Sequence, residues 1–471
     1  MMPLMTDTSS AILLGNGPDP LDVLAGWPEQ KPLAALVTAR GGSPLARWSI
    51  LSMPLGFIHP EKSEKNGSNP IRRFDCGPDL APDPNPDMPP FRGGRLFALT
   101  YELGRRIEPK AGSGPIPDPD EDFPQGAIVL DCPSALVHDR DLDRWWFVGE
   151  PADREELTRH LDLGPAEPRT RPWVTPLTPE TSDERFADRV SRTIDYIHAG
   201  DLFQANITRR YSAAARLPGR ADRRSFAASL IRESQAWFGA HIEIPREDGD
   251  ERTLVSLSPE LFLQYDPASR ILRTRPIKGT LAAGDDPKKL LASEKDAAEL
   301  AMIVDLMRND LGRISQPGSV VVETGRAIET HPGVIHGVAE VAGRLREDME
   351  LDDVLLATFP PGSITGAPKI RAMQIIDEFE SVPRGPYCGA IGFQSRCGHM
   401  ALDVSIRTLD LVPVCDANES WQTHQLRYGA GCGIVADSDP LAETNECDTK
   451  ARLLRDFISV HCEQPGGLTV E

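Results

Sequence analysis

The sequence predicts an α+β fold, and three observations support this class. Segments rich in β-branched and apolar residues are separated by short polar turns, which is typical of strands. Other segments repeat apolar residues at helical spacing between start and stop signals. The two kinds of segment are interspersed without an internal repeat, which favours strand meanders and helices mixed within one architecture.

The first clear helix is expected between N-cap candidates at 181–183 and the stop signal Gly200, because apolar residues from Phe186 to Ile197 recur at helical spacing. Further helices are expected at about 286–311, at 368–380 with Pro368 near the first position, and at 440–460 capped by Ser438. The expected strands are 203–213, 253–258, 261–265, 271–277, 388–394, 400–409 and 425–436.

The composition limits the function classes. The chain has 471 residues, 51 Lys plus Arg against 71 Asp plus Glu, and a net charge of −20. A hydrophobic content of 40% is enough for a substantial core, which excludes general disorder. The acidic balance argues against nucleic-acid binding through a basic face, although it leaves room for a local basic pocket that holds a small anion.

Cysteine usage and hydropathy favour a soluble cytoplasmic protein. The eight cysteines include no CxxC pair, so they predict reduced thiols rather than a disulfide scaffold or a zinc ribbon. The N-terminus lacks the basic region of a signal peptide, and no apolar run reaches the length of about 18 residues needed to span a membrane.

Proline-rich stretches suggest how the chain is organised. The segment 60–90 has many prolines and few apolar residues, which indicates an exposed insertion, and 115–124 repeats the pattern. A softer break at 163–179 separates an N-terminal region, 1–165, from a more regular region, 180–462. Both regions are expected to form one globular unit.

Two carboxylate pairs have the spacing of one helix face. Glu443 and Glu446 precede Lys450 at intervals of three and four, and Asp296 and Glu299 are three residues apart. Solvated helix edges are one interpretation of each pair. The other is a magnesium site, because both pairs lie among small and apolar residues, where unpaired negative charges are costly, and Mg²⁺ prefers carboxylate oxygens.

Three further residues are candidates for catalysis. Lys278 lies between an apolar strand and a Gly-Thr turn, so it is either a surface residue or a buried amine nucleophile. His336 is either a core histidine or a general acid, and Glu260 is either a turn carboxylate or a pocket acid. Glycine-rich loops at 360–373 and 428–440 lead into helices and can bind carboxylate or phosphate, but neither matches a nucleotide motif.

Taken together, nine ordered blocks resemble the chorismate-utilising enzyme family, which includes anthranilate, aminodeoxychorismate, isochorismate and salicylate synthases. The blocks are DLFQANITRRYSA, SPELFL, RPIKGT, KDAAELAMIVDLMRNDLGR, VIHGVAEVAGRL, FPPGSITGAPKIRAMQIIDEFE, RGPYCGAIGFQS, SIRTL and YGAGCGIVADSDPLAETNECDTKA. They cover most of residues 180–460 in the family's order.

The resemblance implies two large packed β-sheets flanked by helices, with the active site in a cleft between the sheets. It implies Mg²⁺ held by Glu299 and Glu446, with Asp296 and Glu443 close by. The remaining implied roles are Tyr387, Arg407, Gly431 and Gly433 for the enolpyruvyl carboxylate, His336 and Thr365 beside the reacting ring, and Gln204 and Lys450 at the substrate.

Two positions distinguish members of the family. Isochorismate and salicylate synthases have a lysine base where this sequence has Gln204, so the resemblance argues against those activities. Lys278 in PIKGT matches the aminodeoxychorismate synthases, for which attack of this amine on the ring precedes displacement by ammonia, with Glu260 as the proton donor or acceptor. The product, 4-amino-4-deoxychorismate, serves 4-aminobenzoate and folate synthesis.

The resemblance leaves two alternatives and implies one partner. The alternatives are anthranilate synthase component I, and a catalytically silent protein that binds chorismate or scaffolds an amidotransferase. Because no amidotransferase segment is recognised in the chain, ammonia is expected from a separate glutamine amidotransferase subunit or from free ammonium. At Thr38 and Ala39 the sequence lacks the acidic-Ser pair that contacts tryptophan in regulated members.

Overall fold

The structure is a computed structural model that describes residues 11–39, 44–58, 80–83, 85–112, 122–123, 126–164, 171–246, 249–282, 284, 286–331, 334–414 and 423–463. Most of the proline-rich segment 60–90, and most of 115–124, lies outside the described residues.

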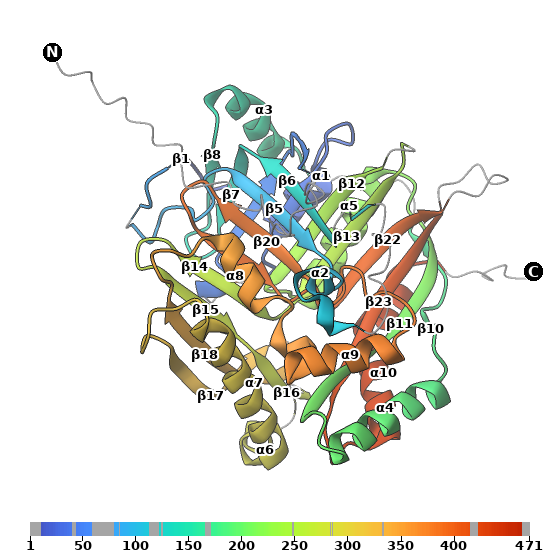
Figure 1. Ribbon diagram of the computed structural model, residues 1–471. Coiled ribbons are helices and arrows are strands. Elements are labelled where there is room, and N and C mark those ends of the chain that lie inside the picture. The colour runs from blue at the N-terminus through green and yellow to red at the C-terminus, as the bar shows by residue number, and fades with distance from the viewer. Residues whose placement is uncertain are drawn as a thin grey trace, which may run out of the picture.

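Two large antiparallel sheets dominate the described chain, and helices surround them (Figure 1). The first sheet has 13 strands and the second has 10. The expected α+β fold of two packed sheets flanked by helices is therefore confirmed. Strands from before and after the segment 163–179 pair within both sheets, as β2 (Ala34–Val37) does with β12 (Phe238–Pro245) and β5 (Gly94–Leu99) with β20 (Ala390–Ser395).

The first sheet follows the order β1 (Ala11–Gly15), β8 (Arg144–Val148), β7 (Ala135–Asp139), β3 (Trp48–Ser52), β2 (Ala34–Val37), β12 (Phe238–Pro245), β13 (Glu251–Ser258), β22 (Thr408–Val414), β23 (Thr423–Ile434), β11 (Gln204–Arg216) and β10 (Thr178–Pro179), with β19 (Gly366–Ala367) and β9 (Trp173–Val174) also on β11. The second follows β16 (Ile277–Ala282), β18 (Val334–Arg344), β15 (Ile271–Arg275), β14 (Leu261–Asp266), β21 (Met400–Asp403), β20 (Ala390–Ser395), β5 (Gly94–Leu99), β6 (Ala127–Cys132) and β4 (Gly56–Ile58), with β17 (Val321–His331) on β18.

The helices are α1 (Pro20–Gly26), α2 (Leu103–Ile107), α3 (Arg154–Thr158), α4 (Asp183–His198), α5 (Arg220–Ser234), α6 (Pro287–Ala292), α7 (Glu294–Gly312), α8 (Leu351–Thr358), α9 (Lys369–Phe379) and α10 (Pro440–His461). Helix α7 packs on β16 and β18 of the second sheet, and α10 packs on β23 of the first (Figure 1). These two helices carry the predicted carboxylate pairs.

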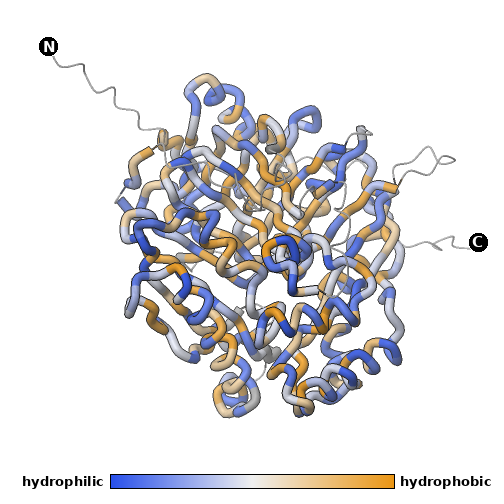
Figure 2. The backbone as a smooth tube through the Cα atoms, viewed as in Figure 1, coloured by the Kyte–Doolittle hydropathy of each residue, from blue (hydrophilic) through white to orange (hydrophobic). Residues whose placement is uncertain are grey.

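The sheets pack face to face through apolar side chains that both contribute. One buried cluster contains Ala34, Ile50, Val137, Ala240, Ile242 and Leu254 from the first sheet together with Leu96, Ala98, Ile128, Leu130, Ile391 and Phe393 from the second. A larger cluster joins the helices to the sheets. Figure 2 shows the same division, since hydrophobic colour follows many central strands and hydrophilic colour dominates the outer helix α4.

Two predicted segments are interrupted in the structure. The helix predicted at 286–311 is divided into α6 and α7, because Ser293 has extended backbone angles and its side chain accepts a hydrogen bond from the amide of Asp296. The strand predicted at 271–277 ends at Arg275, since Pro276 has no amide hydrogen to donate, and β16 begins at Ile277.

Two other predictions also need correction. The strand predicted at 400–409 is divided into β21 of the second sheet and β22 of the first, and Arg407 lies in the crossover with a φ of 54°. The N-cap of α10 is Asp439 rather than Ser438, because the Asp439 carboxylate accepts from the amide of Ala442 at 2.8 Å. By contrast, α4 begins after its predicted cap Ser182.

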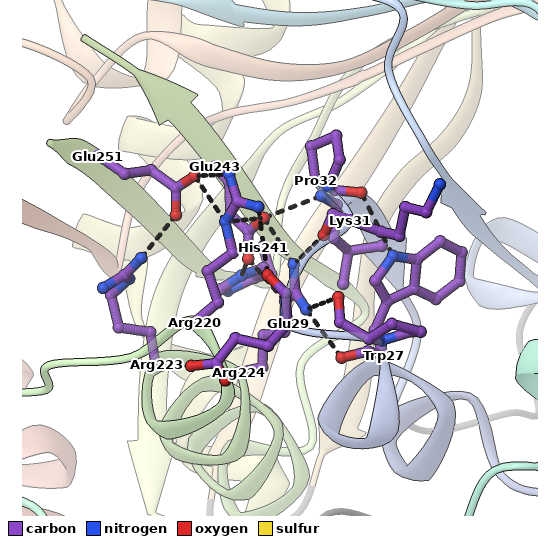
Figure 3. A network of polar contacts seen from close by, with 12 residues as sticks. Trp27, Glu29, Lys31, Pro32, Arg220, Arg223, Arg224, His241, Glu243 and Glu251 are labelled. Atoms are coloured by element: carbon purple, nitrogen blue, oxygen red, sulfur yellow. Dashed lines mark hydrogen bonds and ion pairs between the residues drawn. The ribbon is translucent and has the colours of Figure 1, made fainter. Parts of the chain in front are cut away.

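A buried ion network fixes the N-terminal segment to the first sheet (Figure 3). The guanidinium of Arg224 on α5 binds both oxygens of Glu243 on β12, at 2.6 and 2.8 Å, and both side chains are fully buried. Arg224 also donates to the carbonyl oxygens of Trp27 and Lys31, at 2.8 and 2.6 Å. The network therefore joins a helix, a strand and the loop that follows α1.

We expect Glu243→Ala to lower the free energy of unfolding by about 3–5 kcal/mol at pH 7, because it leaves Arg224 buried without its counter-charge. Burial raises the pKa of Glu243, but hydrogen bonds with His241 and Arg224 and the charges of these two side chains lower it by more. The net result is a pKa that falls from 4.5 to about 2. The stabilisation should therefore be complete above pH 4.5 and disappear as the pH falls through 2.

Urea unfolding of the native protein and the variant at several pH values measures this difference. Glu155→Ala is a suitable control, since within the described chain the Glu155 carboxylate pairs only with Arg159, on the surface, and it should change stability by less than about 1 kcal/mol. Equal stability of Glu243→Ala and the native protein at pH 7 would contradict a structural role for the network.

Candidate active site

Lys278 lies near the start of β16, where this strand pairs with β18. Its amine donates to the carbonyl oxygen of Ser363 at 3.1 Å. Burial lowers the pKa of Lys278, while the charges of Glu299 and Glu260 partly oppose that change. The structure therefore favours the interpretation of Lys278 as an enclosed amine over that of a freely solvated surface lysine.

Glu260 lies between β13 and β14 and is only 4% exposed. Burial raises the pKa of its carboxyl group, against the opposing effects of a hydrogen bond with Ser363 and of the charge of Lys278. Glu260 and Lys278 thus share Ser363 as a neighbour. Sequence analysis missed Ser363 as an individual residue, although it included the glycine-rich loop 360–373 in which Ser363 lies.

The first residue of β11, Gln204, reaches the same place from the first sheet. It is fully buried, and neither its amide nitrogen nor its amide oxygen has a hydrogen-bond partner among the described residues. A Cβ atom on Gly433 of β23 would lie 2.3 Å from Nε2 of Gln204 and 3.5 Å from Nζ of Lys278. Gly433 therefore leaves the space in which Gln204 and Lys278 approach each other.

Lys450 of α10 contacts β23 at Gly431, two residues before Gly433. The Lys450 amine donates to the carbonyl oxygen of Gly431 at 2.7 Å and binds the Glu446 carboxylate at 2.8 Å. Burial opposes the charge on this amine, but neighbouring Cys432 and Glu446 raise its pKa above the ordinary value. A positive charge is thus held beside the backbone of Gly431.

Tyr387 and Arg407 also lie beside β23. A Cβ atom on Gly429 would lie only 2.2 Å from the Tyr387 ring, so this glycine allows the ring to pack on β23. Arg407 is half-buried in the crossover between β21 and β22, and its charge and that of Lys450 both lower the pKa of Tyr428 against the effect of burial. These contacts place the predicted carboxylate-binding residues around one strand.

Acidic residues of α7 and α10 approach Lys278 from two directions. The charges of Glu299 and Glu446 both raise the pKa of Lys278. Asp296 lies beside Gly279, the residue after Lys278, because a Cβ atom on Gly279 would be 3.0 Å from the carboxyl carbon of Asp296. Glu299 of α7 and Glu446 of α10 therefore both act on the Lys278 amine, and Asp296 lies beside the next residue of the same strand.

On α10, Glu443 and Glu446 form a small cluster with Cys432 of β23. One ligand atom of each lies within 4.8 Å of the others. Glu443 is 5% exposed and accepts a hydrogen bond from the Ser438 hydroxyl at 2.7 Å. Cys432 was not predicted as part of the site, because a lone cysteine among glycines gives no ligand spacing. The carboxylate oxygens fit a hard cation such as Mg²⁺.

His336 and Thr365 are both buried near these residues. In the pairing of β18 with β16, His336 lies opposite Thr280, and the adjacent Gly337 lies opposite Lys278. The Thr365 hydroxyl donates to the carbonyl oxygens of Pro361 and Gly362, at 3.1 and 3.2 Å. Thr365 therefore holds the turn that carries Ser363, in addition to lying beside the site.

A separate cavity of about 100 Å³ lies between strands of both sheets, with Thr38 in its lining. The Thr38 hydroxyl donates to the carbonyl oxygen of Trp237 at 2.7 Å. This volume is well below the roughly 300 Å³ at which pockets for small molecules usually begin.

The six cysteines in the described part of the chain are free thiols. Within the same part, no helix is long and apolar enough to cross a membrane.

A family model for chorismate binding enzymes matches residues 64–456. The chain belongs to the chorismate-binding enzyme family, which the nine sequence blocks predicted. Aminodeoxychorismate synthase component 1 from Klebsiella aerogenes is 36% identical over 91% of this chain and 89% of its own length. Anthranilate synthase component 1 from Streptomyces coelicolor is 33% identical over 92% of this chain and 84% of its own length.

Solved structures agree with this assignment. Anthranilate synthase component I from Streptococcus pneumoniae superimposes with a TM-score of 0.71 and 28% identity, covering 88% of this chain and 93% of that one. The menaquinone-specific isochorismate synthase from Escherichia coli shares the fold with a TM-score of 0.64, at 17% identity and 94% coverage of both chains.

Proposed function

We propose that the chain is a synthase that combines chorismate with ammonia to give 4-amino-4-deoxychorismate, a precursor of 4-aminobenzoate and folate. The observation that carries this proposal is the half-buried amine of Lys278, whose pKa desolvation lowers, beside the buried carboxyl group of Glu260. A lysine nucleophile at this position is what the resemblance associates with amination that leaves the enolpyruvyl group in place.

The environment of Lys278 and Glu260 suits the first step. Burial favours the neutral form of each group, so that Lys278 can attack the ring as a free amine and Glu260 can give a proton to the departing hydroxyl. Ser363 positions both groups through its contacts with them. Ammonia then displaces Lys278 from the ring, and the enzyme regains its free amine.

The enolpyruvyl carboxylate of the substrate would be bound along β23. Arg407, the Tyr387 hydroxyl and the backbone at Gly431 and Gly433 would hold the enolpyruvyl carboxylate, and Lys450 adds positive charge beside Gly431. Gln204 offers an amide that can orient a neighbouring polar group, but it cannot serve as a base for water.

Carboxylates from α7 and α10 would hold Mg²⁺ at the other end of the substrate. Glu299 and Glu446 are the proposed ligands, with Asp296 and Glu443 in support. The ion would bind the ring carboxylate and stabilise negative charge as the hydroxyl leaves. Without such a cation, these carboxylates would repel a dianionic substrate.

The proposed source of ammonia is a separate glutamine amidotransferase subunit. The component 1 name of the Klebsiella aerogenes relative supports a two-component enzyme. Because ammonia itself is the second substrate, high concentrations of an ammonium salt should support turnover without the partner.

Anthranilate synthase activity is the second candidate, favoured by the Streptomyces coelicolor and Streptococcus pneumoniae relatives. Only that reaction aromatises the ring and releases pyruvate. Purified protein incubated with chorismate, Mg²⁺ and ammonium should therefore consume chorismate without releasing pyruvate or fluorescent anthranilate. Appearance of both products would replace the proposed reaction by the second candidate, and no consumption of chorismate would favour a silent binding protein.

A further inference from the structure

A larger cavity of about 470 Å³ lies beside the proposed active site. Tyr387 and Gly429 belong to its lining, and the β23 strand continues from Gly429 to Gly431 and Gly433. Other lining residues come from α2, the start of α4, β11, β13, β22 and the loop at 380–386, together with Phe123. Its volume is within the roughly 300–1,000 Å³ typical of sites for small molecules.

The charge of this lining is opposite to that of the chain. Eight arginines, carried by α2, α4, β11, β13, β23 and the loop at 380–386, face four carboxylates. The excess of four positive charges occurs in a protein with a net charge of −20. This is the local basic pocket that the overall composition left room for.

All four carboxylates already have partners, so they do not neutralise the remaining arginines. Glu380, Asp410 and Glu180 each bind one arginine, whereas Glu102 accepts hydrogen bonds from backbone amides. The contacts are Glu380 with Arg384 at 2.7 and 2.8 Å, Asp410 with Arg252 at 2.7 Å for both oxygens, Glu180 with Arg210 at 2.7 Å, and Glu102 with the amides of Arg384 and Gly385 at 2.8 and 3.1 Å.

Arg185 and Arg189 differ from these paired arginines. They are one turn apart on α4, and in the described part of the chain neither guanidinium has a hydrogen bond or an ion pair. Arg189 is half-buried, and burial lowers its pKa although the charge of Glu380 opposes this. Two like charges at this spacing destabilise a helix, and an anion between them would offset the repulsion.

We propose that this cavity binds a small cyclic carboxylate through Arg185 and Arg189. Guanidinium groups bind carboxylates in paired hydrogen bonds, which gives both strength and orientation. The apolar surfaces of Phe123, Val382 and Pro383 favour an organic body over an inorganic anion. Two sources of such a ligand have this chemistry. One is the substrate on its way to the active-site cleft, and the other is a separate effector.

Isothermal titration with benzene-1,3-dicarboxylate tests the proposal without requiring turnover. The double variant Arg185→Gln/Arg189→Gln is expected to bind one probe molecule fewer per chain than the native protein. Arg192→Gln is the matched control, because Arg192 lies on the same helix but pairs with Glu378 at 2.7 Å, and it should bind as the native protein does. Inorganic phosphate should bind the native cavity at least about tenfold more weakly than the dicarboxylate.

An unchanged stoichiometry and affinity in the double variant would overturn the proposal, as would phosphate binding as tight as that of the dicarboxylate. Circular dichroism of the variants verifies that each has folded. A second experiment, which rests on the proposed function, distinguishes the two sources of the ligand. A lower kcat/KM for chorismate at low ionic strength in the double variant identifies the substrate, and an unaltered kcat/KM with loss of probe binding identifies a separate effector.

Discussion

Lys278→Ala is expected to lower kcat for formation of 4-amino-4-deoxychorismate by at least about 10³-fold, since it removes the proposed nucleophile. The half-buried amine lies beside Glu260 and Gln204, and no other described lysine donates to Ser363. The proposed binding residues for the substrate carboxylates do not include Lys278, so KM for chorismate should change much less than kcat. Product formation with saturating ammonium, followed by chromatography, measures both constants.

Two further variants separate nucleophilic attack from a simple effect of charge. Lys288→Ala changes an exposed lysine on α6 and should retain native activity. Lys278→Arg places a positive charge at this position, but a guanidinium is not a nucleophile at neutral pH, so this variant should be as inactive as Lys278→Ala. Substantial activity in Lys278→Arg would indicate that the charge of Lys278, rather than its amine, supports catalysis.

Glu299→Gln is expected to abolish magnesium-dependent turnover and to weaken Mg²⁺ binding by at least about tenfold. An amide is a poorer ligand than a carboxylate. The change also removes one of the two negative charges, of Glu299 and Glu446, that act on Lys278 from α7 and α10. Isothermal titration of Mg²⁺ gives the affinity independently of activity.

The control for this variant is Asp456→Asn, an exposed acidic change near the far end of α10. It should leave both Mg²⁺ affinity and turnover as in the native protein. If Glu299→Gln binds Mg²⁺ with native affinity and turns over at the native rate, the assignment of the carboxylate site is wrong.

The fold class and most elements of the C-terminal region could be predicted from local sequence patterns. Within the predicted segments, the errors lie where one residue redirects the chain, as Ser293 does between α6 and α7, or where a continuous β pattern crosses between sheets at Arg407. Four elements of this region, α5, β12, β17 and α8, were not predicted. Local patterns contain no information about strand order. The pairing of β2 with β12, more than 190 residues apart, depends on packing of the whole chain.

Prediction of the site depended on the type of residue. Charged residues in apolar surroundings, such as Lys278 and Glu260, are conspicuous in a sequence because their burial is costly. Ser363 and Cys432 are not conspicuous, because small polar residues occur in many loops and strands. Their place in the site follows only from the contacts of Ser363 with Lys278 and from the position of Cys432 beside Glu443. The role of the glycines of β23 likewise becomes visible only in the structure, where side chains pack against them.

The central claim is that Lys278 forms a covalent bond with the substrate ring, and intact-mass spectrometry of the protein during incubation tests it most directly. With chorismate and Mg²⁺ present and ammonia withheld, the native protein should gain the mass of chorismate less one water, and peptide mapping should place the adduct on Lys278. Lys278→Ala should show no adduct. An equal adduct on both proteins, or its location on another residue, would contradict the account.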